Sequence, residues 1–326
     1  MSLKSIYDGY VGFLKQAALG TAVVPTQFVR FLSPVKMDAE QDIDVYPEGG
    51  GGFYDLTAHK KFHKHDGSFD LNVRPQTAAM LFAYALGADA KSGAGPYTHV
   101  LTPARPLPYV TIERGIKTDL LTERIQDCLI SKLACNGKAG DPLHLAVDFM
   151  GIKAVLEAAN SSDAYETDRA FVFQDGTFTV FGGAYMRITG FGLNIDNNVE
   201  GDIQTVKVHR QDIQAQKLAV ALDIEIVYDS TDTNYADIYY GGGTTIVETV
   251  ATGAVVMDFV YGADAAEREF KFEIPSGGLV YKDITKPAPG PEPGTLRQTV
   301  SCDVLKVSGS ELITVTFKDN NDVDYV

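Results

Sequence analysis

The chain has 326 residues and a mass of 35.3 kDa, a length that fits two domains or one large β domain. Hydrophobic residues make up 45% of the sequence and charged residues 22%, which excludes a wholly disordered chain, a collagen-like fibre and a coiled coil. The net charge of −15 has the wrong sign for binding a phosphate backbone, because such binding depends on clustered Lys and Arg. An acidic surface still suits nucleic acid that moves past without sticking.

The same composition predicts where the protein is made. Its three cysteines, Cys128, Cys135 and Cys302, are odd in number and widely spaced, so we expect buried thiols in a reducing compartment. Charged residues interrupt the apolar patches of segment 1–21, so we expect no signal peptide there. No run approaches the ~20 apolar residues of a membrane span. We therefore expect synthesis in a cytoplasm and no membrane partner.

Helical patterns are few. Segment 5–19 is a possible helix at the N-terminal end. The best pattern covers 75–87, with Pro75 near the start, an apolar face that includes Leu81 and Tyr84, and Gly87 as the stop. A weaker pattern covers 231–240 and ends in three glycines.

Most other segments alternate apolar and polar residues with period two, which predicts strands. The alternation occurs at 110–112, 143–149, 171–173, 178–180, 218–226, 270–274 and 313–317. Turns are expected at the pairs Asp66 and Gly67, Asn136 and Gly137, Asp175 and Gly176, and Ser308 and Gly309. The sequence therefore predicts a mainly β protein with a sandwich or barrel core.

Three segments read as connections. Four glycines at 49–52 indicate a loop, and the Pro/Gly-rich run 286–294 is extended and cannot lie in a central strand. Segment 158–168 is small and polar, which is typical of a linker.

The features on the two sides of that linker follow the same order. Phe69-Asp70-Leu71 matches Leu222-Asp223-Ile224, the helix at 75–87 matches that at 231–240, and the strands at 110–113 and 147–149 match those at 270–273 and 315–317. We interpret this as a tandem duplication, with a first β domain at 1–160 and a second at 161–326 that carries the Pro/Gly-rich insertion. Two unrelated β domains of similar rhythm are the alternative.

Each half also contains a long polar hairpin before its helix, at 34–65 and at 191–216. A hairpin standing alone in water is marginal, so it needs neighbours. In a symmetric ring those neighbours are the same hairpins of other copies.

No motif for a nucleophile elbow, a phosphate loop or a zinc site is present, so we expect no enzyme, no cofactor and no metal. His59, His63 and His65 suggest a metal site, but the lysines among them favour a solvated basic strand. Two acidic sets lack the spacing of a calcium loop and fit a solvated or lumen-facing strand instead. These sets are Asp38, Glu40, Asp42 and Asp44, and Asp196, Glu200 and Asp202.

Taken in order, several segments resemble the major tail tube proteins of long, non-contractile-tailed bacteriophages. They are ALGTAVVPTQF at 18–28, GSFDLNVRP at 67–75, MLFAYALG at 80–87, YTHVLTP at 97–103, TIE at 111–113 and ITGFGLNIDNN at 188–198. The resemblance covers most of the chain, and it rests on the order of the segments because each one is loose.

The resemblance implies tail-tube-type β-sandwich or barrel modules, each with a short flanking helix and a long hairpin that contributes to an inner β-barrel. It implies rings, hexameric or trimeric with two modules per chain, that stack into a tube for the genome. The duplication favours the trimeric, pseudo-hexameric ring. Implied partners are tape-measure, tail-tip and tail-terminator proteins, with double-stranded DNA passing through the tube without specific binding.

We hypothesise that the two acidic sets contribute to the lumen of that tube, because like charge repels the phosphates of passing DNA. The implied location is the virion tail. Alternatives are another virion or secretion-tube component, a surface β-sandwich binding module, and a hydrolase with a dispersed site.

Overall fold

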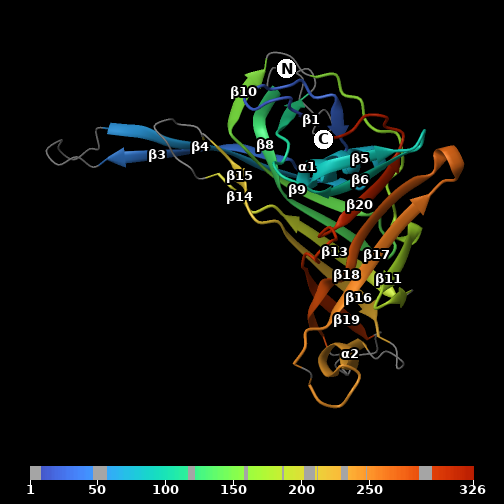
Figure 1. Cartoon of the computed structure of the whole chain (residues 1–326). Helices are drawn as coiled ribbons and strands as arrows, with labels where there is room; N and C mark the ends of the chain where they lie inside the picture. The colour runs from blue at the N-terminus through green and yellow to red at the C-terminus, as the bar shows by residue number, and fades with distance from the viewer. Residues whose placement is uncertain are drawn as a thin grey trace.

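The computed structural model describes residues 9–46, 57–116, 122–157, 161–185, 187–201, 210, 212–228, 234–246, 248–285 and 296–326. The chain is mainly β, and its strands pair in antiparallel fashion (Figure 1). The predicted loops at 49–52 and 286–294 lie outside the described residues.

Among the described residues of the first half, one helix lies among ten strands. They are β1 (Gly9–Lys15), β2 (Gln27–Val29), β3 (Lys36–Tyr46), β4 (Thr57–Asn72), α1 (Pro75–Leu86), β5 (Gly87–Ser92), β6 (Tyr97–Pro103), β7 (Val110–Ile116), β8 (Thr122–Lys138), β9 (His144–Gly151) and β10 (Lys153–Glu157). Figure 1 shows the β3–β4 hairpin extending far from the body of the molecule.

Where the structure describes it, the second half holds another ten strands, one α-helix and two 3-10 turns. They are η2 (Phe173–Asp175), β11 (Gly176–Val180), β12 (Gly183–Ala184), β13 (Ile188–Asp196), β14 (Val199–Glu200), β15 (Gln214–Ala215), β16 (Ala219–Val227), α2 (Asn234–Tyr240), β17 (Thr252–Tyr261), η3 (Asp264–Ala266), β18 (Arg268–Ile284), β19 (Arg297–Val304) and β20 (Thr314–Asp319). Both helices lie where the sequence predicts them.

The two halves pair their strands in the same order. In the first half the order is β2–β1–β7–β8–β9–β4–β3, with β10 also paired to β8. In the second half it is β12–β11–β17–β18–β19–β16–β13, with β20 also paired to β18. This order matches β7 with β17 and β9 with β19, so the predicted alignment of segment 110–113 with β18, and of 147–149 with β20, was wrong. Period-two alternation fixes a core face but not a strand's partners.

Strand pairing also joins the two halves. β8 pairs with β13, which produces one sheet in the order β3–β4–β9–β8–β13–β16–β19–β18. β6 pairs with β20 in a second junction. A single hydrophobic cluster runs through both halves as a consequence.

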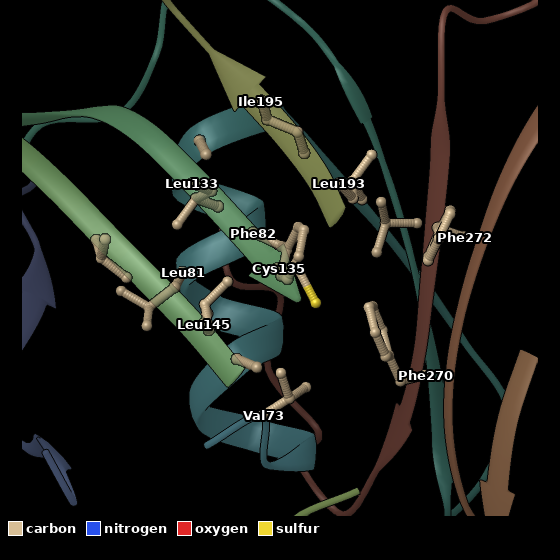
Figure 2. Close-up of a cluster of buried hydrophobic side chains, with 14 of the residues drawn as sticks. Val73, Leu81, Phe82, Leu133, Cys135, Leu145, Leu193, Ile195, Phe270 and Phe272 are labelled. Carbon is tan, nitrogen blue, oxygen red and sulfur yellow. The ribbon is translucent and has the colours of Figure 1, made fainter. Parts of the chain in front are cut away.

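Helix α1 lies in the centre of that cluster. Figure 2 shows Leu81 and Phe82 beneath the strands that carry Leu133 and Leu193, with Phe270 of β18 across from them. The Phe82 and Phe270 rings are 5.7 Å apart between centroids. Every residue of α1 except one is buried, whereas the sequence predicted one apolar face. The Ala-rich sequence allows this, because small side chains let strands approach the helix on every side.

The predicted helix at 5–19 is wrong where the structure describes it. Residues 9–15 form β1, which lies between β2 and β7. Tyr10, Val11 and Phe13 are buried. Two hydrogen-bonding neighbours and a buried site override the weak helical preference of so short a segment.

Two predicted turns are wrong as well, because Gly67 and Gly137 lie inside the long strands β4 and β8. A Cβ at Gly67 would overlap the ring of Phe149, and one at Gly137 would overlap the ring of Phe191. These glycines mark places where an aromatic ring crosses the backbone of a strand.

The predicted linker is anchored where it is described. Glu166 accepts hydrogen bonds from the backbone N–H groups of Gln76 and Thr77 at 2.8 and 2.9 Å, and from the Thr77 hydroxyl at 2.6 Å. Asp168 accepts a hydrogen bond from Arg268 of β18 at 2.7 Å. Phe171 is buried in this connecting segment rather than in a named strand, so the strand predicted at 171–173 was wrong.

Candidate functional site

The sheet that spans both halves has one face in the core and one face open. Along β8, Leu133 and Cys135 are buried while Lys132 and Asn136 are exposed. The neighbouring strands alternate in the same way. We call the open side the polar face.

Strand register arranges the polar face in three rows that run across the strands from the first half to the second. The first is Lys36, Ser68, Asp148, Lys132, Asp196 and Ala219. The second is Asp70, Ala146, Ala134, Asn194, Ala221 and Asp303. The third is Asn72, His144, Asn136, Gly192, Asp223 and Ser301. None of these residues is buried.

Negative charge dominates these rows. The three rows hold five aspartates, one each from β4, β9, β13, β16 and β19, and only two lysines. Partial desolvation by the surrounding sheet raises the pKa of Asp148, and the charges of Asp70 and Asp196 raise it further, while Lys132 and Lys36 oppose the shift. The aspartates of separate strands are therefore near enough to repel one another.

The polar face lacks the side chains that usually bind nucleic acid. Its remaining positions are mostly Ala, Ser, Asn and Gly, and no position in the three rows holds Phe, Tyr, Leu or Ile. Proteins that hold nucleic acid strands combine a basic groove with aromatic side chains on which bases stack. The three rows supply neither.

The structure places the first predicted acidic set on the projecting hairpin. In β3, Asp38 lies opposite Asp66, Glu40 opposite Lys64, Asp42 opposite Phe62, and Asp44 opposite His59. The side chain of Asp44 is half-buried, and those of the other three lie outside the described side chains. Their strand joins the polar face through Lys36.

The second predicted set separates. Asp196 lies on the polar face between Lys132 and Ala219. Glu200 lies in β14, where its carboxylate accepts a hydrogen bond from Gln216 at 3.1 Å. Asp202 lies outside the described residues.

Sequence reasoning missed the acidic residues that accompany Asp196. Asp148 and Asp223 occupy polar positions of the strands predicted at 143–149 and 218–226, Asp70 lies in β4 beside the apolar Phe69 and Leu71, and Asp303 lies in β19, which was not predicted. The alternation itself was the available signal. Their alignment into rows depends on strand order, which the pattern does not encode.

The described parts of the two long hairpins differ in their surroundings. The β3–β4 hairpin beyond Lys36, here called the projecting arm, has β3 as an edge that pairs only with β4 among the described residues. The second hairpin, here called the docked arm, carries β14 and β15, and its described residues Arg210 and Ile213 pack on the first half. Its Ile213 is buried with Leu107 and Leu129.

Arg210 fastens the docked arm. Its side chain is 1% exposed and forms a two-pronged ion pair with Asp66 of β4, with Nη2 2.9 Å from Oδ2. Nη1 also donates to the Gly151 carbonyl at 3.3 Å. An arginine so buried is stable only because these oxygens satisfy its charge.

The histidines and cysteines have structural surroundings. The rings of His63 and His65 stack on β4 with centroids 6.3 Å apart, and His65 is buried rather than solvated. Cys128, Cys135 and Cys302 are buried and unpaired with one another, and burial raises the pKa of the Cys302 thiol to about 12. Over the described ranges, no three His, Cys, Asp or Glu side chains gather as a metal site.

Among the described helices, none has the length and apolar character to span a membrane. A family model described as phage tail tube protein matches residues 8–304. No curated protein matches the chain.

Proposed function

Because this chain belongs to the phage tail tube protein family, which places it in the virion tail, we propose that it is a non-enzymatic subunit that self-assembles into stacked rings. The rings form a conduit through which double-stranded DNA passes during genome delivery. The observation that carries the proposal is the continuous sheet β3–β4–β9–β8–β13–β16–β19–β18, one face of which is core and the other acidic.

The junction inside the chain supports a way to close the ring. β8 of the first half pairs with β13 of the second, and the matched pairing order makes β18 the counterpart of β8, and β3 the counterpart of β13. We propose that β18 of one copy pairs with β3 of the next in the same manner. Closure then removes the sheet edge that a lone subunit presents.

We propose domains at 1–160 and 161–326 as two tail-tube modules that share one core. Three copies supply six modules, so we propose a trimeric ring with pseudo-sixfold symmetry. Tape-measure, tail-tip and tail-terminator proteins are the proposed partners at the ends of the tube.

The polar face is the proposed lining of the lumen. Its aspartates repel phosphates, and its few lysines offer the duplex backbone little to bind. Asp70, Asp148, Asp196, Asp223 and Asp303 replace the hairpin set as the main candidates, while Asp38, Glu40, Asp42 and Asp44 extend the lining along β3.

Electron microscopy of the purified protein, combined with native mass spectrometry, tests the proposal. We expect rings or tubes with a central hole and a ring mass of three chains. A ring of six chains would retain the tube and exclude the trimer. A monomer that never assembles at any protein or salt concentration would overturn the function.

A further inference from the structure

A strand of the first half covers one sheet edge of the second half. β20 lies beside β18, and its other edge pairs with β6, from Val315 opposite Leu101 to Asp319 opposite Tyr97. β6 belongs to the β5–β6 hairpin, which directly follows α1. The hairpin after the helix of one half thus extends the sheet of the other half.

β10 is the strand of the first half that corresponds to β20. It continues the line of β9 along β8, just as β20 continues the line of β19 along β18. Among the described residues, β10 pairs with β8 and with no other strand, so its outer edge is open. Leu156 on this strand is 65% exposed. An open edge of this kind is a template for a further strand.

The second half has no hairpin at the place that β5 and β6 occupy in the first. Segment 241–251 connects α2 to β17, the counterpart of β7, and its described residues form no strand. Apart from Ala251 these residues are exposed, Ile246 by 70% and Val250 by 66%. The segment is rich in Thr, Ile and Val, the β-branched residues that favour strands.

A single chain keeps these two features apart. Figure 1 shows α2 and β10 at opposite ends of the molecule, and segment 241–251 begins directly after α2. The ring contact proposed above sets β18 of one copy beside β3 of the next, so the second half of one copy meets the first half of its neighbour. This repeats the junction within the chain, with segment 241–251 in the place of the β5–β6 hairpin and β10 in the place of β20.

We infer that segment 244–250 of one copy adds as a strand to the open edge of β10 in the next copy. The inference rests on the proposed ring assembly and specifies a second contact in it, separate from the pairing of β18 with β3. Main-chain hydrogen bonds hold such an added strand. Ile246 and Val250 are four residues apart, so they share one face of the strand and leave water together.

Proline substitutions test the main-chain pairing. Successive N–H groups of a strand point to opposite sides, so one of Glu248→Pro and Thr249→Pro removes a donor that faces β10. Neither residue lies in a strand of the subunit, so we expect both variants to keep the denaturation midpoint of the unmodified protein. We expect one of them to raise the protein concentration needed for ring formation by about tenfold. Glu248→Ala and Thr249→Ala keep the N–H group and should assemble like the unmodified protein.

Cross-linking identifies the strand that receives the segment. Leu156→Cys is mixed under assembly conditions with Ile246→Cys or with Val250→Cys and treated with a short bismaleimide; the three native cysteines are buried. We expect a covalent dimer from at least one mixture and none from any variant alone. A mixture of Leu156→Cys with Val260→Cys is the matched control, because Val260 is exposed but lies outside the segment.

Microscopy of the same samples separates the two ways of failing. Rings that show no more dimer than the Val260 control overturn this inference and leave the ring assembly standing. Folded proline variants that both assemble at the usual protein concentration do the same, and the cross-link alone decides if these variants unfold. The absence of rings from the unmodified protein overturns the proposed function itself.

Discussion

At the scale of single residues, glycines and buried polar groups determine how closely the elements of the fold can pack. Gly137 lies near the C-terminal end of β8, where the ring of Phe191 crosses the strand and the Leu143 side chain also approaches. A strand normally disfavours glycine, so its presence here is explained by this close approach.

We expect Gly137→Ala to destabilise the protein by about 1–3 kcal/mol, because the new methyl group overpacks a filled core. Gly183→Ala is the control, since a Cβ at Gly183 meets nothing within 4 Å, and it should change stability by no more than about 0.5 kcal/mol. Chemical denaturation measures both. Equal midpoints for the two variants would contradict this account of Gly137.

His99 is a buried titratable residue that connects the C-terminal end to the rest of the fold. It is fully buried, with Nδ1 2.9 Å from Asp89 and Nε2 3.1 Å from the Asn321 carbonyl. The Tyr325 ring packs against it, tilted by 33°, with 4.4 Å between the centroids. Burial opposes the charged imidazole, but these hydrogen bonds and the charges of Asp89 and Asp319 raise the pKa of His99 overall.

A raised histidine pKa stabilises the folded state below the unfolded value of 6.5, and this contribution is lost as pH rises through the folded pKa. We therefore expect the free energy of unfolding to fall as pH rises above 6.5, and this dependence to be absent in His99→Gln. Denaturant titrations at several pH values from 6.5 upward measure the free energy of unfolding of both proteins. The same slope in both proteins would rule out His99 as its source.

At the scale of elements, α1 shows how a segment distant in sequence completes a helix. The helix begins with Pro75, and the side chain of the N-cap residue before it makes no capping hydrogen bond. Glu166 from the connecting segment supplies the missing acceptors. The connection between the halves is thus part of the packing of α1 rather than a tether.

We expect Glu166→Ala to lower stability by about 1–2 kcal/mol, the usual cost of losing a helix cap. Glu166→Gln keeps one carbonyl acceptor and should lose less. Glu311→Ala, at an exposed position, is the control. Thermal or chemical denaturation gives the comparison, and an unchanged midpoint for Glu166→Ala would contradict the capping role.

At the scale of the whole molecule, the polar face exists only because β8 pairs with β13. That pairing aligns aspartates from both halves on one surface. In the proposed tube this surface faces the DNA, and its charge keeps the duplex from binding.

Replacing Asp70, Asp148 and Asp223 with lysine changes the net charge from −15 to −9, since each substitution adds two charges. We expect assembled rings of this variant to retain double-stranded DNA at low salt and to release it as salt rises. A matched variant with lysine at Asp264, Asp322 and Asp324 has the same net charge but leaves the polar face unchanged. Equal DNA retention by both variants would show that position on the sheet is irrelevant.

The sequence by itself determined the mainly β class, the position of α1, the two long hairpins and the acidic balance. Each of these follows from local pattern or from composition, such as Pro75 and Gly87 bounding an apolar run, or the alternation in β16.

Only the tertiary structure decided the rest. Residues 9–15 form a strand because two neighbouring strands pair with them. Gly67 and Gly137 lie in strands, at places where an aromatic ring crosses the backbone, and not in the predicted turns. Strand register aligns Asp70 with Asp303 across six strands. A period-two pattern says which side of a strand is buried but not which strand lies beside it. Strand order and register are set by contacts between distant segments, and those contacts made a scattered set of aspartates into one surface.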